Sequence, residues 1–534
     1  MSAQIHKKNI LLLTVMVTSL LFIGVIVQSC FSSSTSVLVR TPSTVPLSNM
    51  FGINVYEWNF LQNPAHPEDV DTIYEPKMNL IETFSSVRHY LDWGHLEPEK
   101  NHYTFNPSHS GSWNYDAMYQ RCKQDHILVL ACIKTCPQWL MNTYPDKDRD
   151  YENVPAPYGS DRSLPASYIQ QAKMAFQFAA RYGSNKNVNH EAVSVETNPR
   201  WNGDRINQKK IGLNLIRYIE CDNERDKWWK GDKAHQSAEE YAANLSAFYD
   251  GDKGRLGKNA GVKNADPSMQ VVMAGLAKPD VNYVKGIVEW CKKHRGFKKN
   301  GQVDLCFDVI NYHYYATNDE SAKNDQDYKG ISPEASRSGQ IADEFVSYAS
   351  SLPGKPPVWV TEAGYDLNQG SPQRAIPMAK QSAQLVQAEW LLRTAFLYMR
   401  HGIDRLFYYQ LFDDSPNSPG KYATSGLNDE TKRRPAADYV MQTRKLLGNY
   451  RYQKTISEQP LVDVYLLGSK VMYVFINPND GQPSKYSLNA GASKSAVVYN
   501  LIPGANEAAK TTITPYQGRF EISTTGTPVY LEKQ

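Results

Sequence analysis

Two glutamates in this chain, Glu224 and Glu362, stand where a hydrophobic run of strand length ends. The first follows Leu215–Cys221, and the second follows Val358–Thr361. A strand inside a parallel barrel must be apolar, so a carboxylate at its C-terminal end is expected at the mouth of the barrel, where such folds carry their chemistry. Two carboxylates that face one cleft are the groups that cleave glycosidic bonds. We therefore predict that Glu224 and Glu362 work as a pair.

The neighbours of the two glutamates indicate different roles. Glu224 follows Asn223, whose neutral amide can hydrogen-bond a sugar 2-hydroxyl, and an acid/base carboxyl needs surroundings that raise its pKa. Glu362 lies two residues before Gly364, which lets the chain turn sharply behind a nucleophile held on a rigid strand. We predict Glu224 as acid/base and Glu362 as nucleophile, with carboxyl groups about 5–5.5 Å apart rather than about 6.5–9.5 Å.

Short β-rich runs alternate with amphipathic segments of helical period over residues 49–447, which is the pattern of a (β/α)8 barrel, a TIM barrel in the α/β class. A helix is predicted over Ala379–His401, and insertions are predicted at Pro145–Leu164 and Glu196–Gly212. The eight strand candidates are Phe51–Glu57, Ser86–Leu91, Ile127–Lys134, Leu215–Cys221, Gln270–Gly275, Val309–Tyr314, Val358–Thr361 and Arg405–Leu411.

The pattern changes past Leu447 to short alternating runs separated by turn residues. Residues 448–534 are therefore predicted to form a small C-terminal β-sandwich domain, which we expect to pack against the barrel rather than to bind sugar. Its strand candidates are Leu461–Leu467, Val471–Ile476, Ser495–Asn500, Phe520–Ser523 and Thr527–Leu531.

The N-terminus has the pattern of a targeting segment. Two lysines, Lys7 and Lys8, precede an apolar run from Ile10 to Val27, as in a signal peptide over residues 1–29. The run ends in Val-Gln-Ser-Cys30, which resembles the lipobox of bacterial lipoproteins, and that resemblance implies lipidation of Cys30 and membrane attachment through the lipid alone. A Ser/Thr-rich tether is predicted over residues 30–48. The folded part is expected outside the cytoplasm, in the periplasm or at the cell surface; secretion and an uncleaved anchor remain alternatives.

Composition argues against several other classes of protein. The net charge is +3 without a basic block, so we expect no nucleic-acid partner. No His-x-His, His-Glu-x-x-His or Gly-x-Ser-x-Gly motif occurs, and the cysteines lack zinc-ligand spacing. We therefore predict no metal and no organic cofactor, and we expect a monomer. Whether any of the six cysteines beyond Cys30 pair is left open.

Several motifs, taken with carboxylates on strands four and seven, resemble clan A of the glycoside hydrolases, among them its β-xylosidases, β-galactosidases and endo-glucanases. The stretch from Arg88 through Trp93 to Leu-Glu-Pro98 resembles the segment after strand two of these enzymes. Pro137-Gln-Trp139-Leu resembles their strand-three motif, and His313-Tyr-Tyr315 resembles their strand-six motif. The resemblance implies that Arg88 bonds the nucleophile region, that Asn223 bonds the 2-hydroxyl and that Tyr315 touches the nucleophile.

This sequence departs from that pattern in three places. Arg225 follows the Asn-Glu pair, where many members have proline. Strand eight lacks the usual tryptophan floor and offers Tyr409, Gln410 or Phe412 instead. Asp222 precedes Asn223 and could be mistaken for the acid, although strand alternation points it away from its neighbour.

The 34 tyrosines and 10 tryptophans supply candidate surfaces for stacking on sugar rings. The predicted sugar contacts are Asn223, Arg88, His313, Tyr315, Trp58, Trp93, Trp139, Trp228 and Gln410, and Trp201 and Trp229 are further candidates. For Trp228 and Trp229, packing against a helix is an equal alternative.

Together these features predict a retaining hydrolase of β-linked polysaccharide or oligosaccharide, with endo action favoured by the long loops. An inactive carbohydrate-binding lipoprotein on the same barrel is the alternative, and substitution of Glu362 separates the two. Xylan, β-1,3-glucan, mannan and host glycans all remain open as substrates, and exo action is not excluded.

Overall fold

The computed structural model describes residues 40–199, 205–318, 327–378, 380–479 and 482–534. Residues Thr41–Gln534 form one compact unit. The predicted leader, Cys30 and Trp201 lie outside the described residues. None of the helices in the described residues combines the length and the hydropathy that a membrane span requires.

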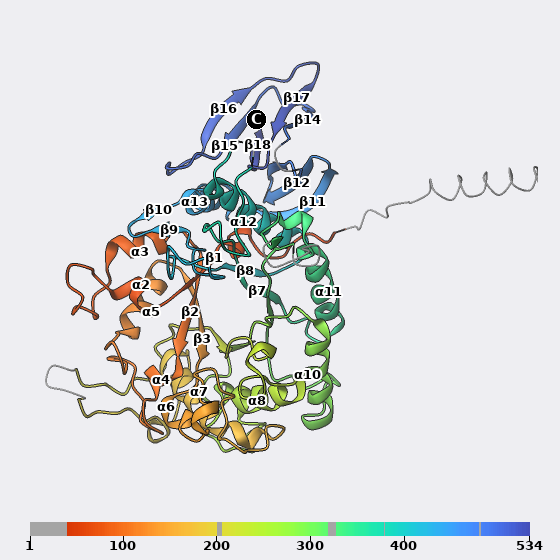
Figure 1. The fold of residues 1–534 in the computed structure, drawn as a ribbon. Coiled ribbons are helices and arrows are strands. Elements are labelled where there is room, and N and C mark those ends of the chain that lie inside the picture. The colour runs from red at the N-terminus through yellow and green to blue at the C-terminus, as the bar shows by residue number, and fades with distance from the viewer. Residues whose placement is uncertain (1–39, 200–204, 319–326, 379, 480–481) are drawn as a thin grey trace, which may run out of the picture. The chain divides into compact units, whose positions relative to one another are not determined.

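Eight parallel strands form the barrel in the order β5-β4-β3-β2-β1-β8-β7-β6 (Figure 1). Parallel bridges Val272↔Val309 and Leu276↔Tyr312 join the two outer strands and so bring the sheet round. All eight predicted strands are present, and the predicted fold class is confirmed. The strands are β1 (Gly52–Val55), β2 (Ser86–Asp92), β3 (Leu128–Lys134), β4 (Tyr218–Cys221), β5 (Gln270–Met273), β6 (Ile310–His313), β7 (Val358–Ala363) and β8 (Arg405–Tyr408).

Strand β4 begins three residues later than predicted. The backbone N–H groups of Leu215 and Ile216 both donate to the carbonyl of Tyr182, at 2.9 and 3.0 Å. Leu215 and Ile216 therefore bond the end of the preceding helix instead of a neighbouring strand. The predicted strand Leu215–Cys221 thus contributes only its last four residues to the sheet.

Helices follow the strands around the barrel. The predicted helix over Ala379–His401 is present as α12, which begins after the N-cap Ser382, whose side-chain oxygen accepts from the N–H of Leu385 at 3.4 Å. The helices are α2 (Trp58–Leu61), α3 (Glu75–Ile81), α4 (Trp93–Leu96), α5 (Tyr115–Gln124), α6 (Gln138–Met141), α7 (Ile169–Tyr182), α8 (Ala238–Asp250), α9 (Val262–Ala265), α10 (Val281–His294), α11 (Ser338–Ser351), α12 (Ala383–Arg400) and α13 (Pro435–Leu447). Short 3-10 turns are η1 (Leu47–Met50), η2 (Asp146–Asp148), η3 (Pro165–Tyr168), η4 (His190–Ala192), η5 (Trp228–Lys230) and η7 (Pro333–Ala335), and a small hairpin pairs β9 (Asn428–Asp429) with β10 (Lys432–Arg433).

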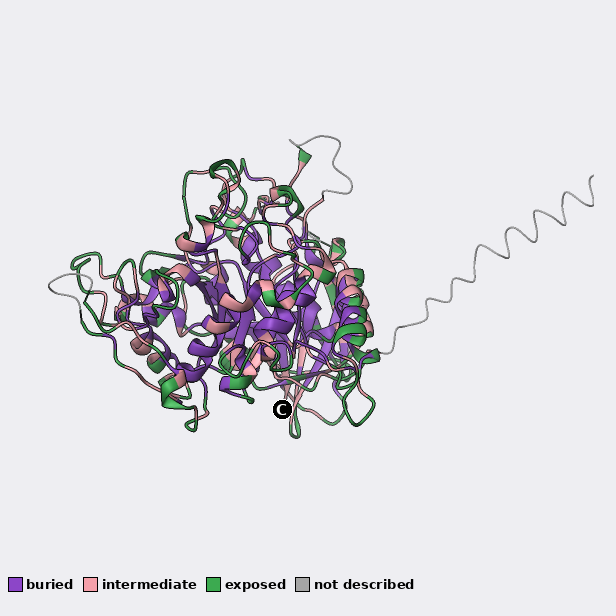
Figure 2. Cartoon of the chain, turned by 90° about the horizontal axis from the view of Figure 1, so that it is seen from below, coloured by how far each residue is buried: buried purple, intermediate pink, exposed green. Residues whose placement is uncertain are grey.

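Buried residues fill the barrel strands and the helix faces turned toward them, and exposed residues concentrate in the loops (Figure 2). Inside the barrel an apolar cluster is formed by Leu130, Val272, Val309, Trp359 and Phe407. Polar side chains form a second group on the barrel strands, including Arg88 on β2, Glu220 on β4 and Asn311 on β6, all fully buried. The barrel is thus sealed with apolar side chains in one layer and holds a polar layer toward its mouth.

The C-terminal strands form a six-stranded sheet, β11-β12-β13-β18-β15-β16, and a two-stranded sheet, β14-β17. A small core shared by the two sheets includes Phe475, Leu488, Phe520 and Leu531. The predicted sandwich strands are all present, and β11, β14 and β16 are additional. Their bounds are β11 (Arg451–Glu458), β12 (Leu461–Leu467), β13 (Lys470–Ile476), β14 (Ser484–Asn489), β15 (Ala496–Asn500), β16 (Ala509–Ile513), β17 (Arg519–Thr524) and β18 (Val529–Lys533).

These C-terminal strands pack on α12 and α13 (Figure 1). Arg400 at the end of α12 forms an ion pair with Asp463 on β12 at 3.1 Å, and both are buried. On α13, the hydroxyl of Thr443 lies 2.6 Å from that of Tyr530 on β18. Buried polar pairs of this kind fix how the sheet lies on the helices, as expected for a packing partner of the barrel.

The last residues of the predicted tether belong to the folded unit. The backbone N–H of Ser43 donates to the carbonyl of Tyr452, and that of Leu47 donates to the carbonyl of Tyr450, both at 2.8 Å. Leu47 and Met50 are completely buried. Backbone hydrogen bonds therefore hold the segment from Ser43 to Leu47 against the start of the C-terminal sheet.

The six cysteines from Cys122 onward are all buried and unpaired. Cys291 on α10 and Cys306 lie closest, with their Sγ atoms 3.5 Å apart. Burial of these thiols accords with cysteine acting as a small apolar side chain.

Candidate active site

Glu362 lies on β7 with its carboxylate almost completely buried and surrounded by donors. The Arg88 guanidinium donates to its Oε1 at 2.8 Å, and the Tyr315 hydroxyl donates to its Oε2 at 2.9 Å. The hydroxyl of Tyr90 also donates to Oε1. Burial raises the pKa of the Glu362 carboxyl, but the charges of His313 and Arg88 and the two tyrosine hydrogen bonds outweigh it, so the pKa is lowered. Glu362 is therefore held as an ionised carboxylate in a fixed orientation.

Glu224 lies just beyond β4, where the chain turns. Both Asp222 and Glu224 have positive φ angles, 72° and 49°. This turn directs the Glu224 carboxyl to His313, whose Nδ1 lies 2.9 Å from its Oε1. Burial raises the pKa of the Glu224 carboxyl and the negative charge of Glu362 raises it further, while His313 opposes both; the net pKa is raised. The surroundings thus favour a protonated Glu224 beside an ionised Glu362.

His313 on β6 stands between the two carboxylates. One carboxylate oxygen from each glutamate and one His313 ring nitrogen all lie within 4.8 Å of one another. The other ring nitrogen, Nε2, lies 3.0 Å from the hydroxyl of Thr361. Burial lowers the pKa of His313, but Glu362 and Glu224 outweigh it, so the pKa is raised.

Those three side chains form the one cluster, in the described part of the chain, whose ligand atoms are close enough to hold a metal ion. The Arg88 guanidinium 2.8 Å from Glu362 already neutralises that carboxylate and repels a cation. The donor set therefore fits a proton-transfer site better than a metal site.

Arg88 bonds both Glu362 and Asn223, the residue that precedes Glu224. Its side chain is completely buried on β2 and donates to Glu220 at 2.6 and 3.0 Å, to Asn54 at 3.0 Å and to the Oδ1 of Asn223 at 2.8 Å. One guanidinium thus holds Asn223 and Glu362 in register. The predicted contact between Arg88 and the nucleophile region is found in the structure.

Glu220 and Asn54 were not identified from the sequence. Glu220 interrupts an apolar run on β4, and a charge inside a barrel strand was the available signal. Its Oε1 also accepts from the side chain of Asn311 at 3.0 Å and from the N–H of Gly275 at 3.1 Å. These bonds satisfy the hydrogen-bonding capacity of a completely buried carboxylate.

Replacing Arg88 by methionine is expected to lower the free energy of unfolding by about 3–5 kcal/mol, because Glu220 and Glu362 are left as buried charges without their partner. Thermal or urea unfolding measures the loss. Arg121→Met is the matched control, since Arg121 forms three ion pairs at the surface and its loss should cost about 1 kcal/mol or less. Equal losses in the two variants would contradict the network.

Asn223 keeps one end of its amide for a ligand. Its Oδ1 accepts from Arg88 at 2.8 Å and from the hydroxyl of Tyr90 at 3.2 Å, whereas its Nδ2 forms no hydrogen bond with the described residues. That orientation leaves the N–H donors toward the mouth, as the predicted bond to a sugar hydroxyl requires.

Asp222 forms an ion pair with Arg225. The guanidinium of Arg225 lies 3.2 Å from the Asp222 carboxylate, and both side chains are buried. Arg225 also donates to the carbonyl of Ala234 at 2.6 Å and to the side chain of Gln236 at 2.8 Å. The arginine that replaces the expected proline therefore fixes the loop after β4.

A stack of aromatic rings leads from Glu362 to the surface. Tyr90, which sequence reasoning missed, stacks on Tyr56 with ring centres 5.6 Å apart, and Tyr56 stacks on Trp58 at 4.4 Å. Trp58 is 39% exposed. This placement puts the predicted sugar contact Trp58 at the outer end of a stack that begins beside Glu362.

Tyr409 is the residue after β8 that faces the site. Its hydroxyl lies 3.3 Å from that of Tyr56, and its ring meets Tyr90 edge-on at 6.3 Å. Tyr422 meets Tyr409 edge-on at 6.0 Å and tilts against Tyr315 at 4.8 Å. Gln410, which we predicted as a sugar contact, is almost completely buried at 2% exposure. Of the three residues left open, Tyr409 is the one whose ring and hydroxyl contact the aromatic side chains around Glu362.

Trp93 does not line the mouth, contrary to our prediction. It begins the short helix α4 and is completely buried, with its indole N–H donating to Glu97 at 2.7 Å. Trp139 meets it edge-on at 5.7 Å and donates to the carbonyl of Glu97 at 2.9 Å, so it supports the same turn while its ring stays partly exposed. Trp93 is therefore a packing residue beneath the turn that contains Glu97.

Trp228 and Trp229 lie on η5 and are both exposed, forming a perpendicular pair with ring centres 4.9 Å apart. The alternative that they fill a helix interface does not hold, because neither ring is buried. Trp228 is placed four residues beyond Glu224, on the loop at the mouth of the barrel.

Neither a protein-family profile nor a curated protein sequence matches this chain. Among solved structures, a family 39 glycoside hydrolase from Bacteroides cellulosilyticus has a TM-score of 0.59 and 17% identity, over 92% of this chain and 81% of its own. A family 30 endoxylanase from Clostridium papyrosolvens has a TM-score of 0.51 and 13% identity, over 92% and 97%. A family 51 α-L-arabinofuranosidase from Bifidobacterium longum has the same four values.

These similarities show the fold, a (β/α)8 barrel followed by a C-terminal β domain.

Proposed function

We propose that this protein is a retaining glycoside hydrolase of β-linked glycans. The observation that carries the proposal is a pair of carboxyl groups with oxygens within 4.8 Å and pKa values shifted in opposite directions. That closeness is nearer to the carboxyl spacing of about 5–5.5 Å in retaining enzymes than to the spacing of about 6.5–9.5 Å in inverting enzymes. The barrel fold, shared with three glycoside hydrolases, supports the same reading.

In the first displacement, ionised Glu362 attacks the anomeric carbon while protonated Glu224 gives its proton to the leaving oxygen. The bond to the leaving oxygen breaks as the bond to the Glu362 oxygen forms, which yields a glycosyl ester and a released alcohol. Arg88, Tyr90 and Tyr315 hold the attacking carboxylate in place through their hydrogen bonds.

In the second displacement, Glu224 is ionised and accepts a proton from water, whose oxygen attacks the same carbon and releases Glu362. Two inversions restore the starting configuration. His313 lies 2.9 Å from Glu224 and opposes the rise in its pKa, so it stabilises Glu224 while that carboxyl carries charge. Asn223 offers its free N–H donors to the sugar 2-hydroxyl.

Endo action on a polysaccharide is the favoured mode, because exposed rings such as Trp58 and Trp228 lie outside the reactive centre and suit extended chains. The alternative, a binding protein without turnover, predicts ligand retention and no cleavage by the same barrel.

Incubation of residues 41–534 with xylan, β-1,3-glucan, mannan and β-1,4-glucan tests the proposal. We expect one of them to be cleaved and the first product to appear as the β anomer in a time-resolved proton NMR spectrum. Initial release of the α anomer would contradict the retaining mechanism. Retention of a glycan without cleavage would favour the binding-protein alternative.

A further inference from the structure

Exposed aromatic side chains gather on the two loops that follow β3 and β4. Tyr151 and Tyr158 lie on the first loop, and Trp228 and Trp229 lie on the second, each with more than half of its surface exposed. Large rings that are gathered at a surface and contribute nothing to a core mark a place where a ligand binds. Flat apolar faces bordered by polar groups suit sugar rings in particular.

The two loops are held together by ion pairs, so the rings are positioned before any ligand arrives. Lys230 lies 3.1 Å from Asp150 and 2.9 Å from Glu152, and its amine stands 5.1 Å from the centre of the Tyr151 ring. Arg162 donates to the carbonyl of Asp232 at 2.6 Å. A surface fixed in this way loses little conformational entropy when it binds.

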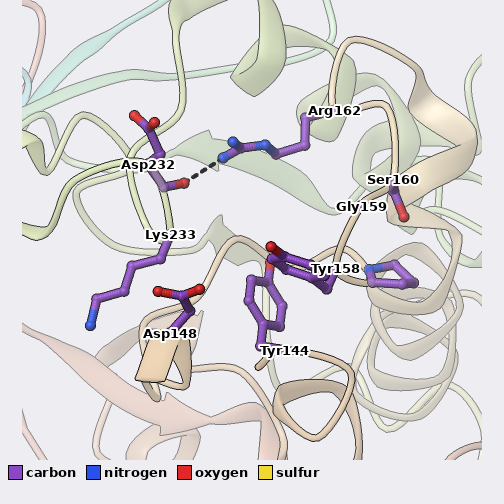
Figure 3. Close-up of a pocket in the computed structure, with 9 residues that line it drawn as sticks. Tyr144, Asp148, Tyr158, Gly159, Ser160, Arg162, Asp232 and Lys233 are labelled. Carbon is purple, nitrogen blue, oxygen red and sulfur yellow. Dashed lines mark hydrogen bonds between the residues drawn. The ribbon is translucent and has the colours of Figure 1, made fainter. Parts of the chain in front are cut away.

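A hollow of 420 Å³ lies between the same loops (Figure 3), and neither Glu224 nor Glu362 is among the residues that line it. Its volume is within the range of about 300–1,000 Å³ typical of small-molecule sites. Figure 3 shows the rings of Tyr144 and Tyr158 together on one side and Arg162 extending over the other. The remaining lining residues are Asp148, Pro157, Gly159, Ser160, Asp232 and Lys233.

The charges of the hollow favour a neutral ligand rich in hydroxyl groups. Its two cations are already paired, Lys233 with Asp150 at 3.2 Å and Arg162 with Glu240 at 3.5 Å. The carboxylates of Asp148 and Asp232 form no hydrogen bond or ion pair with the described residues. They can accept hydrogen bonds from hydroxyls and repel an anion, so an acidic sugar is disfavoured.

The hollow is connected to the acid/base residue by a short stretch of chain. The N–H of Lys227 donates to the carbonyl of Glu224 at 3.2 Å, and Trp228 follows directly. Asp232 in the hollow is eight residues beyond Glu224, which limits their separation to about 28 Å. We propose that Trp228, Trp229, Tyr151 and the hollow at Tyr158 form a distal subsite that binds the far end of a neutral glycan chain cleaved at Glu224 and Glu362. Its link to cleavage rests on the proposed function.

Titration of the Glu362→Gln variant with neutral xylo-, cello-, manno- and laminari-oligosaccharides of increasing length tests this subsite without turnover. We expect affinity to rise with length in one series and then to level off. Tyr158→Ala should remove the last increment, about 5- to 10-fold in Kd, and Tyr158→Phe should keep it. Tyr516→Ala, an exposed tyrosine on the C-terminal domain, is the matched control.

The proposal would be overturned if the gain in affinity with oligosaccharide length survives both Tyr158→Ala and the double change Trp228→Ala/Trp229→Ala. Affinity that does not increase with length in any neutral series would also overturn it, as would tighter binding of glucuronate-bearing oligosaccharides than of neutral ones. If the length-dependent binding is lost in the variants but the wild-type protein cleaves nothing, the proposed function fails while the subsite stands. If the wild-type protein cleaves a glycan but affinity does not depend on oligosaccharide length, the subsite fails while the proposed function stands.

Discussion

Glu362→Gln lowers kcat/KM for the cleaved β-glycan by about 10⁴-fold or more, because a neutral amide cannot attack the anomeric carbon or leave as a carboxylate. The fold should survive, since the amide oxygen still accepts from Arg88 or Tyr315, although it is no longer a charged partner. Initial rates of reducing-sugar release over a range of substrate concentrations measure the loss, and thermal unfolding checks the fold.

Glu289→Gln is the control for this change, because Glu289 is an exposed glutamate on α10 that pairs only with Lys292 in the described structure. It should keep the wild-type rate. A Glu362→Gln protein that is folded and retains more than about a tenth of the wild-type rate would contradict the assignment of the nucleophile.

Glu224→Gln is expected to lower kcat/KM for a glycan by about 10²–10⁴-fold, since general acid catalysis is lost from the first displacement. An activated aryl glycoside, whose leaving group needs no proton, should lose much less in that step. Comparison of the two substrates in the same variant isolates the acid role, and equal losses on both would contradict it.

The pH profile provides a second measurement for Glu224. The lowered pKa of Glu362 keeps the nucleophile ionised down to pH values below the ordinary glutamate range, so the acid limb should be displaced downward. The raised pKa of Glu224 keeps the acid protonated to higher pH, so wild-type kcat/KM should fall on the alkaline side as that proton is lost. Glu224→Gln should remove the alkaline limb, and its persistence would assign that limb to another group.

The strands and the carboxylate pair could be predicted from sequence because each depends on local pattern. Apolar runs such as Val358–Thr361 are long enough only for a strand, and a polar residue directly after such a run must lie at the mouth of a parallel barrel. The start of β4 was misplaced because Leu215 is apolar for a different reason, which is its packing against the end of α7.

The environment of the site was harder to predict because it is formed by residues distant in sequence. Tyr90 reaches Glu362 from β2, and Glu220 on β4 bonds Arg88 on β2 past the intervening strand β3, contacts that the folded barrel creates. The prediction that Trp93 contacts sugar was wrong for a different reason. Its motif is local in sequence, but the short helix α4 directs the ring into the interior. Exposed aromatics such as Trp228 could be classified only when burial was known.

Trapping of the glycosyl-enzyme tests the central claim most directly. A 2-deoxy-2-fluoro-β-glycoside with a good leaving group slows both displacements, and its activated leaving group lets the ester accumulate. Mass spectrometry of the intact protein should show one added fluoroglycosyl group, and peptide mapping should place it on Glu362. A label on any other residue, or efficient cleavage of the natural glycan with no label in the presence of the probe, would contradict the proposed double displacement.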